Sequence, residues 1–265
     1  MDFDTTRASA DDLVRKQYDK MDDAYWNGIN DLIKKYNIQP KDIIQNYLAF
    51  MQRRDLPRLL AFYEIFQKIE HLPGSIAEIG VFKGSGLFTW GKLLETFCPG
   101  DRIRKVFGFD HFKGYDEFTS EDGISQDFVN THEHKLEYNY DIIDTLNNLH
   151  NDDNLLKGVT RTVIINGDIK DTLPDFVKNS EGLRLSLLYL DVNLYEPTKL
   201  AIEQLYPLVV PGGVVAFSGY GQSPWGGEGK ALEELFSTLD YTPKIHRFNY
   251  ATLPSGYFIK EKVYL

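Results

Sequence analysis

The first segment whose residues could bind a ligand is rich in glycine and reads AEIGVFKGSG (77–86). Glycine permits tight turns and close approach of a ligand to the backbone, and a helix that starts behind such a segment offers free amide groups. Glu78 precedes the first glycine by two positions, where a carboxylate would repel a pyrophosphate. We therefore expect a ligand with a cationic amino or sulfonium group. The small residues expected to contact this ligand are Gly80, Gly84, Ser85 and Gly86.

The glycine spacing separates this segment from two phosphate-binding motifs. It reads G-x-x-x-G-x-G, whereas the dinucleotide motif reads G-x-G-x-x-G. Neither G-K-S nor G-K-T follows, which excludes a P-loop. A nicotinamide-dependent oxidoreductase is an alternative suggested by the α/β pattern alone, and the missing dinucleotide motif argues against it.

Single aspartates follow three of the predicted strands. Asp110 ends the second strand and could accept hydrogen bonds from both hydroxyls of a ribose. Asp168 follows the third strand, where it could lie near an adenine amine, and Asp191 ends the fourth. Together with Glu78, these acids come in order at consecutive strand ends. The series predicts S-adenosylmethionine as the bound cofactor.

Strands and helices must alternate to bring these residues to one edge of a sheet. The apolar runs predict strands over 75–82, 105–110, 162–167, 185–192 and 213–218, helices over 85–97, 197–206 and 230–239, and an antiparallel pair over 244–249 and 256–261. We expect an α/β fold, a doubly wound Rossmann-like sheet of seven strands with an antiparallel last strand. Pro211, Gly212 and Gly213 predict a turn before the fifth strand.

The segments outside this alternation predict the domain organisation. Spaced apolar residues over 11–36 and 41–70 indicate helices, so we divide the chain into an N-terminal helical extension, 1–70, and an α/β domain that binds S-adenosylmethionine, 71–265. The extension is expected to act as a cap or in oligomerisation. The long insertion 111–158 holds four of the six histidines and is expected to form a substrate lid.

Composition limits the partners of the chain. Its 265 residues carry a net charge of -10, so the surface as a whole cannot attract nucleic acid or anionic lipid. No segment reaches the roughly 20 apolar residues of a membrane span, and the N-terminus lacks the order of a signal peptide. Cys98 is the single cysteine, which excludes an intrachain disulfide. These features predict a cytoplasmic protein with a small-molecule substrate.

The motifs resemble those of class I methyltransferases, and more narrowly the macrocin O-methyltransferase type of sugar methyltransferases. The likeness covers roughly residues 50–260 and is most specific in the run D-x-N-L-Y-E-P-T, followed by a helix and P-G-G. The stretches that carry it are AEIGVFKGSG, VFGFDHFKGY, INGDIKDTLP and LLYLDVNLYEPTKLAIEQLYPLVVPGGVVAFSGYG. The resemblance implies methyl transfer from S-adenosylmethionine to a sugar hydroxyl, on a nucleotide-linked or natural-product deoxysugar.

The resemblance also implies a divalent metal such as magnesium, held by acids after the fourth and fifth strands. Asp191 matches the first acid, but Asn193 replaces an aspartate often assigned as base, and Ser218 and Gly219 replace an acid pair. Glu228 could add a second carboxylate. Because magnesium prefers several oxygen ligands including carboxylates, metal dependence stays open. A catalytically silent protein that binds S-adenosylmethionine is the alternative.

Methyl transfer to a hydroxyl requires a group that accepts its proton. Asp191 and His111 are the candidate bases, with His132 and His134 further down the insertion. The residues expected to contact the sugar are Asn193, Tyr195 and Trp225. An amide can orient a hydroxyl, and aromatic faces pack on sugar C–H surfaces. The commonest symmetric assembly predicts a homodimer.

Overall fold

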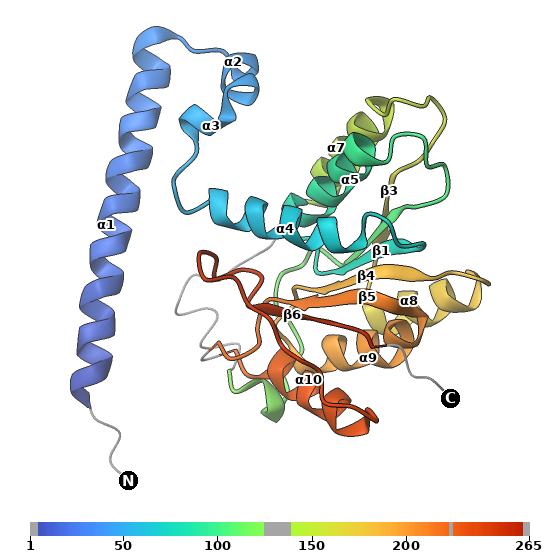
Figure 1. Ribbon diagram of the computed structural model, residues 1–265. Helices are drawn as coiled ribbons and strands as arrows, with labels where there is room; N and C mark the ends of the chain where they lie inside the picture. The colour runs from blue at the N-terminus through green and yellow to red at the C-terminus, as the bar shows by residue number, and fades with distance from the viewer. Residues whose placement is uncertain (1–4, 125–138, 223–224, 262–265) are drawn as a thin grey trace. The chain divides into compact units, whose positions relative to one another are not determined.

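The computed structural model describes residues 5–124, 139–222 and 225–261 (Figure 1). The chain forms two compact units that divide between Leu56 and Pro57. The sequence predicts this boundary at residue 70, whereas helix α4 (Leu56–Ile69) lies almost wholly within the second unit.

The first unit is helical. Helix α1 (Thr5–Tyr36) is followed by the short helices α2 (Pro40–Gln45) and α3 (Tyr47–Phe50). The Tyr25 hydroxyl donates to the carbonyl of Phe50 at 2.9 Å, which ties the end of α3 to the middle of α1.

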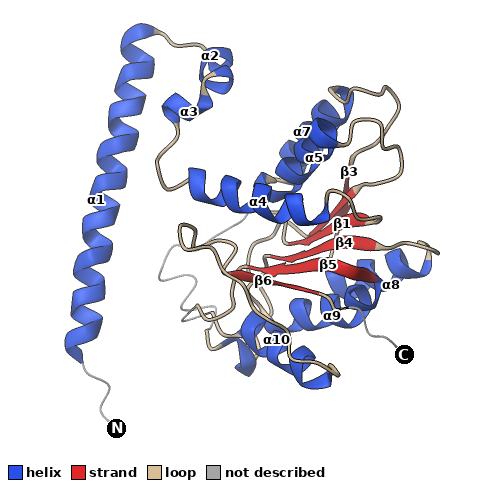
Figure 2. Ribbon diagram, viewed as in Figure 1, coloured by secondary structure: helices blue, strands red, loops and turns tan. Residues whose placement is uncertain are grey.

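The second unit is built on one six-stranded sheet in the order β3-β2-β1-β4-β5-β6 (Figure 2). The strands are β1 (Ser75–Ile79), β2 (Val106–Asp110), β3 (Thr162–Asn166), β4 (Leu185–Leu190), β5 (Val209–Phe217) and β6 (Gly256–Ile259). The first five are parallel, and β6 is antiparallel to β5. Every residue of β1 and β4 is buried, as expected for parallel strands covered on both faces.

Helices cover both faces of this sheet (Figure 1). Helices α4, α5 (Ser85–Phe97) and α7 (Tyr140–Asp152) pack on one face through a core that includes Phe62, Trp90 and Ile143. The other face carries α8 (Ile169–Lys178), α9 (Tyr195–Leu205) and α10 (Gly227–Thr238). Strand residues alternate between the two cores, because successive side chains of a strand point to opposite faces.

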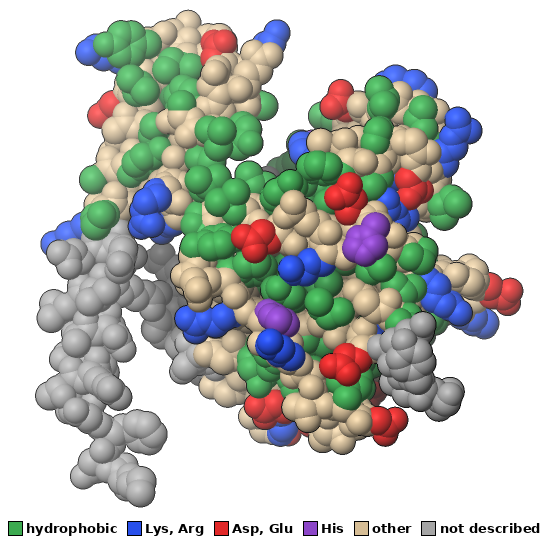
Figure 3. Space-filling view, viewed as in Figure 1, with side chains coloured by type: hydrophobic (Ala, Val, Ile, Leu, Met, Phe, Trp, Pro, Cys, Tyr) green, Lys and Arg blue, Asp and Glu red, His purple; other side chains and the backbone are tan. Residues whose placement is uncertain are grey.

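The visible face of the molecule carries charged side chains of both signs (Figure 3). Figure 3 shows acidic and basic side chains interspersed on the visible face, so the net charge of -10 is not gathered there in one patch. Among the described residues, none of the helices combines the length and the apolar character of a membrane span.

The α/β architecture with an antiparallel last strand is confirmed, but the described residues form six strands rather than seven. The predicted strand 244–249 makes a single antiparallel bridge, His246 to Tyr257. The ladder stops there because the next amide on the partner segment, that of Ser255, turns to the other side and donates to Phe217 in β5 at 2.9 Å.

The predicted turn at Pro211–Gly213 is wrong, because these residues lie inside β5. The pairing of β5 with β4 shifts register here: Leu185 pairs with Val209, whereas Leu187 pairs with Val214. Gly212 takes a φ of 84° and donates its amide to Lys260. The glycine therefore permits a bulge, which lets the strand continue through residues that usually end one.

Candidate active site

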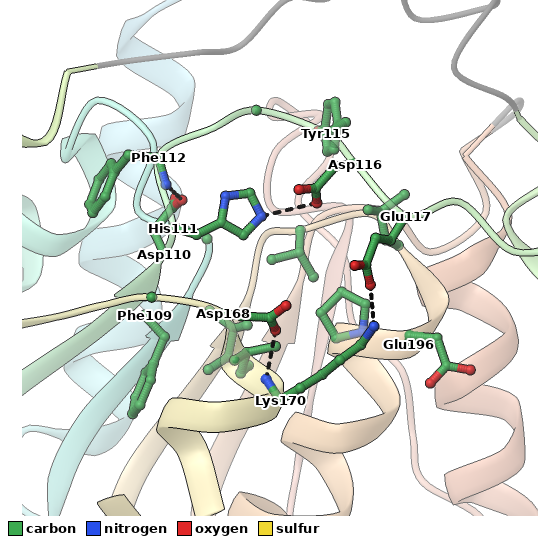
Figure 4. Close-up of a pocket in the computed structure, with 18 of the residues that line it drawn as sticks. Phe109, Asp110, His111, Phe112, Tyr115, Asp116, Glu117, Asp168, Lys170 and Glu196 are labelled. Atoms are coloured by element: carbon green, nitrogen blue, oxygen red, sulfur yellow. Dashed lines mark hydrogen bonds and ion pairs between the residues drawn. The ribbon is translucent and has the colours of Figure 1, made fainter.

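A pocket opens at the carboxyl ends of the parallel strands (Figure 4). Its wall comes from the loop after β1, the segment after β2, the start of α8 and the segment after β4. Of the sequence-predicted site residues, those lining it are Gly80, Asp110, His111, Asp168 and Asp191. The topology thus brings together residues from four separate stretches of the chain, as the parallel arrangement requires.

Glycines in and just after the β1 loop are required by positive φ angles or by close contacts that a Cβ would make. Gly80 has a φ of 93°, and a Cβ there would lie 2.3 Å from the carbonyl oxygen of Asp191. Gly84 precedes α5 in the left-handed conformation, and Ser85 begins the helix. A Cβ on Gly86 would lie 2.3 Å from the Glu78 carboxylate. The loop therefore passes close to the chain just after β4, and the first turn of α5 lies directly over Glu78.

Asp110 holds this loop in place. One of its oxygens, Oδ2, accepts the amides of Val81 and Phe82 at 2.9 and 2.7 Å, and Oδ1 accepts the amide of Phe112 at 2.7 Å. An ionised carboxylate offers about four acceptor positions. Three are taken by amides within the described part of the chain, where one is therefore left for a ligand rather than the two that a bidentate ribose contact needs.

Asp168 caps α8 and lines the pocket from the start of that helix. Its Oδ1 accepts the backbone amide of Lys170 at 2.8 Å. The ammonium of Lys170 in turn pairs with Glu117 across the pocket wall (Figure 4). An adenine amine near Asp168 stays a prediction.

His111 has both ring nitrogens engaged. Nδ1 accepts the amide of Lys113 at 3.1 Å, and Nε2 lies 3.2 Å from Asp116 (Figure 4). A neutral imidazole has one acceptor nitrogen, and here that nitrogen is used. In this arrangement His111 cannot take a proton from a substrate without first breaking the Lys113 contact.

Asp191 forms an ion pair with Arg58, a partner that the local sequence pattern does not indicate. Nη2 of Arg58, in the first turn of α4, donates to Oδ2 of Asp191 at 2.6 Å and to the Tyr189 hydroxyl at 3.3 Å. The same tyrosine hydroxyl lies 2.8 Å from the Ser218 hydroxyl. Burial opposes the charge of Arg58, but Tyr189 and Asp191 more than offset this and raise its pKa.

Glu78 lies behind the loop and is not among the residues that line the pocket. Its side chain is fully buried, and neither oxygen makes a hydrogen bond of ordinary geometry within the described part of the chain. Burial, reinforced by Asp191, raises the pKa of this carboxyl well above its usual range, although Arg58 and the amide of Leu87 act in the opposite direction. The uncharged form is therefore favoured, and a direct contact with a cationic ligand is not what this placement provides.

Glu228, in the first turn of α10, reaches the chain after β4 and β5. Its oxygens accept the amides of Gly219 at 2.5 Å and Asn193 at 3.2 Å. Burial, together with Asp191, raises the pKa of Glu228 to about 8, while the two amides lower it. Asn193, at a φ of 60°, donates its side-chain amide to the hydroxyl of Tyr115 at 2.9 Å.

The remaining predicted residues lie in different places. The Tyr195 hydroxyl donates to Glu234 at 2.8 Å, between α9 and α10, and Tyr195 is not among the pocket-lining residues. Trp225 packs against the pocket residue Tyr115, with ring centroids 4.8 Å apart and ring planes tilted by 39°. His132 and His134 lie outside the described residues.

Asp122 is a positioning residue that the sequence analysis missed. It is buried in the 3-10 turn η1 (Ser120–Asp122), where its Oδ1 accepts the Tyr195 amide at 2.6 Å and its carbonyl accepts the Gly226 amide at 3.1 Å. It therefore connects the starts of α9 and α10. The only local signal was the T-x-x-D spacing of a capping box, which gives no indication of these distant partners.

The residues after β4 and β5 do not fit a divalent cation. Asp191 is paired with a guanidinium, and each oxygen of Glu228 already accepts an amide. Ser218 and Asn193 supply only neutral oxygens. Among the described residues, no group of three His, Cys, Asp or Glu side chains is placed to hold a metal. A hard cation needs carboxylates that are free of competing positive charge, and none is offered here.

Comparisons with known proteins define the class. A crystal structure of the calicheamicin methyltransferase CalS11 superimposes with a TM-score of 0.78 at 23% identity, covering 89% of this chain and 91% of that one. The O-methyltransferase NovP gives a TM-score of 0.60 at 23% identity, covering 76% and 80%. The fold is thus the Rossmann-like fold of methyltransferases.

Sequence similarity defines the family. Residues 45–231 match the model of the macrocin O-methyltransferase (TylF) family, and the chain belongs to that family. A relative from Streptomyces olivaceus, 8-demethyl-8-(2,3-dimethoxy-alpha-L-rhamnosyl)-tetracenomycin-C 4'-O-methyltransferase, is 30% identical over 149 residues. The match covers 56% of this chain and 54% of that relative, or about half the length of each.

Proposed function

We propose that this protein transfers the methyl group of S-adenosylmethionine to a hydroxyl of a sugar. The observation that carries the proposal is the pocket at the carboxyl edge of the sheet, where the glycine loop, Asp110 and Asp168 meet in a chain of the macrocin O-methyltransferase family. S-adenosylmethionine supplies a methyl group on a positively charged sulfur. Asp110 and Asp168, which line the pocket, would hold its nucleoside part.

The contribution of the chain is to position the acceptor hydroxyl and to accept its proton. Positioning alone can be worth ~7–11 kcal/mol in such bimolecular reactions. Asp191 lines the pocket, and burial raises its pKa above the ordinary range even though Arg58 lowers it. The carboxylate is therefore a better proton acceptor than an exposed aspartate would be.

The acceptor is proposed to be a deoxysugar of the rhamnose type. The relative from Streptomyces olivaceus is named for the 4'-hydroxyl of a rhamnosyl group on a natural product. The neighbouring rings of Tyr115 and Trp225, whose planes are tilted by 39°, offer this chain an aromatic surface beside the pocket, and such surfaces suit the C–H face of a sugar. The transfer assay therefore includes both nucleotide-linked sugars and sugars attached to a finished natural product.

The test combines calorimetry with a transfer assay. S-adenosylhomocysteine should bind the protein, and Asp110→Asn should weaken this binding about tenfold or more, because its NH₂ group replaces an oxygen that accepts backbone amides of the loop or of Phe112. Glu203→Gln, an exposed change on α9, serves as the control. Labelled S-adenosylmethionine should then methylate a rhamnoside.

The outcomes separate the two candidate functions. Binding of S-adenosylhomocysteine without transfer to any sugar of the panel would favour the silent binding protein that Asn193, Ser218 and Gly219 suggest. Absence of binding would reject both. The lid over 111–158, the cap, the homodimer and the cytoplasmic location stay predictions.

A further inference from the structure

We propose that the reaction centre carries its own positive charge, the guanidinium of Arg58, and works without a divalent cation. This inference rests on the proposed methyl transfer and concerns the same site. It starts from the disagreement between the family pattern, with acids after the fourth and fifth strands, and the groups that this chain places there.

Arg58 is held on Asp191 by its surroundings. The helix that carries it, α4, is anchored on the sheet by the buried residues Phe62 and Ile65. The guanidinium lies over the ring of Phe62, 5.2 Å from its centroid, and donates to Asp191 at 2.6 Å. A divalent cation on the same carboxylate would lie within a few ångströms of this fixed charge and be repelled by it.

Asn193 and Glu228 together occupy the space that a side chain at position 219 would need. A Cβ on Gly219 would lie 2.9 Å from Oδ1 of Asn193, 3.2 Å from the Cβ and 3.3 Å from the carboxyl carbon of Glu228. The Glu228 oxygens are turned to the amides of Gly219 and Asn193. The second carboxylate thus stabilises the backbone after β4 and β5 instead of offering free ligand positions.

The neutral groups nearby are also committed to partners. The Ser218 hydroxyl lies 2.8 Å from the hydroxyl of Tyr189, which also accepts from Arg58. The side-chain amide of Asn193 donates to Tyr115. Arg58 therefore acts as a positioning residue: it fixes the orientation of Asp191 at the pocket and neutralises the charge that a metal would otherwise neutralise.

Metal binding is tested directly on the 265-residue chain. MnCl₂ is titrated into the protein, with and without S-adenosylhomocysteine, and free Mn²⁺ is followed by electron paramagnetic resonance. We expect no stoichiometric binding that depends on Asp191. One Mn²⁺ per chain, lost in Asp191→Asn but retained in Glu203→Gln, would overturn the proposal. This measurement does not require activity, so it decides the metal question even if no sugar is methylated.

Arg58 is tested by two variants. In the transfer assay, an excess of EDTA should leave the rate of the wild-type protein unchanged. Arg58→Gln should lower kcat about tenfold or more with little change in KM for S-adenosylmethionine, and Arg58→Lys should recover part of the loss because the charge is kept. Melting curves and S-adenosylhomocysteine affinity check that both variants are folded.

Two results would contradict this role of Arg58. The first is an Arg58→Gln variant as active as the wild type. The second is a wild-type rate that EDTA abolishes and Mg²⁺ restores. Should Arg58→Gln not fold, Arg58→Lys and the EDTA experiment still decide. A wild-type protein that binds S-adenosylhomocysteine but methylates nothing rejects the proposed function instead, which the Mn²⁺ titration distinguishes from failure of this inference.

Discussion

At the scale of single residues, buried carboxyl groups dominate this site. Glu78 and Glu228 are both fully buried, and burial raises the pKa of each. They differ in their partners, because Glu228 accepts two backbone amides whereas Glu78 makes no ordinary hydrogen bond in the described part of the chain. The Glu228 carboxyl therefore holds the backbone after β4 and β5 in place, whereas the Glu78 carboxyl stays neutral beneath the glycine loop.

The raised pKa of Glu228 predicts a pH dependence of stability. Its carboxyl has a pKa of about 8 when folded and 4.5 as a reference, so the folded state binds the proton more tightly. The free energy of unfolding should therefore fall as pH rises from about 4.5 to about 8, and then level off. Urea unfolding across this range measures the slope.

The variant Glu228→Gln isolates this contribution. Glutamine cannot ionise, so the variant should show a flatter stability profile than the wild type over the same pH range. Its new amide group would face a backbone donor, which should lower stability by about 1–3 kcal/mol at low pH. Identical slopes for the variant and the wild type would exclude Glu228 as the titrating group.

At the scale of elements, the geometry of the β1–α5 loop depends on contact with β4. The relevant variant is Gly80→Ala, since its Cβ would lie 2.3 Å from a backbone oxygen at a φ of 93°. We expect a loss of roughly 2 kcal/mol or more in the free energy of unfolding and loss of S-adenosylhomocysteine binding. Chemical denaturation and calorimetry measure the two effects.

A matched glycine separates backbone strain from steric overlap. Gly158 has a similar φ of 81°, but nothing lies within 4 Å of its added Cβ. Gly158→Ala should therefore show only the smaller cost of the left-handed conformation and bind normally. Equal effects at Gly80 and Gly158 would mean that close approach to β4 is not what requires the glycine.

The elements that the sequence predicts well are those with a strong local signal. Helix 85–97 and the strands ending at Asp110 and Asn166 agree with the prediction within a residue or so, because their apolar patterns are continuous. The bulge at Gly212 is mistaken for a turn, since Pro-Gly-Gly has the same local preference in both settings. What distinguishes them is pairing with β4 and β6, which is not local.

At the scale of the whole molecule, the first unit carries large exposed apolar side chains, through which we predict that the chain dimerises. Trp26, Ile44 and Leu48 are 45%, 71% and 61% exposed. Such exposure is typical of interaction surfaces, and two-fold dimers are the commonest assemblies. Sedimentation velocity should therefore show a species of twice the 30.5 kDa chain mass.

Two isoleucine variants, one in each unit, test whether the first unit carries the dimer contact. Ile44→Asp, in the first unit, should shift the protein toward the monomer. Ile103→Asp, in the second unit, changes an isoleucine that is 84% exposed and should leave the assembly as it is. A single 30.5 kDa species for the wild type would reject the homodimer, and equal dissociation by both variants would argue against a role for the first unit.

Local sequence patterns predict the order of most strands and helices, and which acids stand at the strand ends. These features depend on local periodicity and on residue type, so the strand pattern alone places Asp110, Asp168 and Asp191 at one edge, where they line the pocket. Only the tertiary structure decided which of the acids are free. Arg58 reaches Asp191 across 133 positions of sequence, and Glu228 joins Gly219 and Asn193. Such pairings follow from how helices pack on the sheet, which no local pattern encodes.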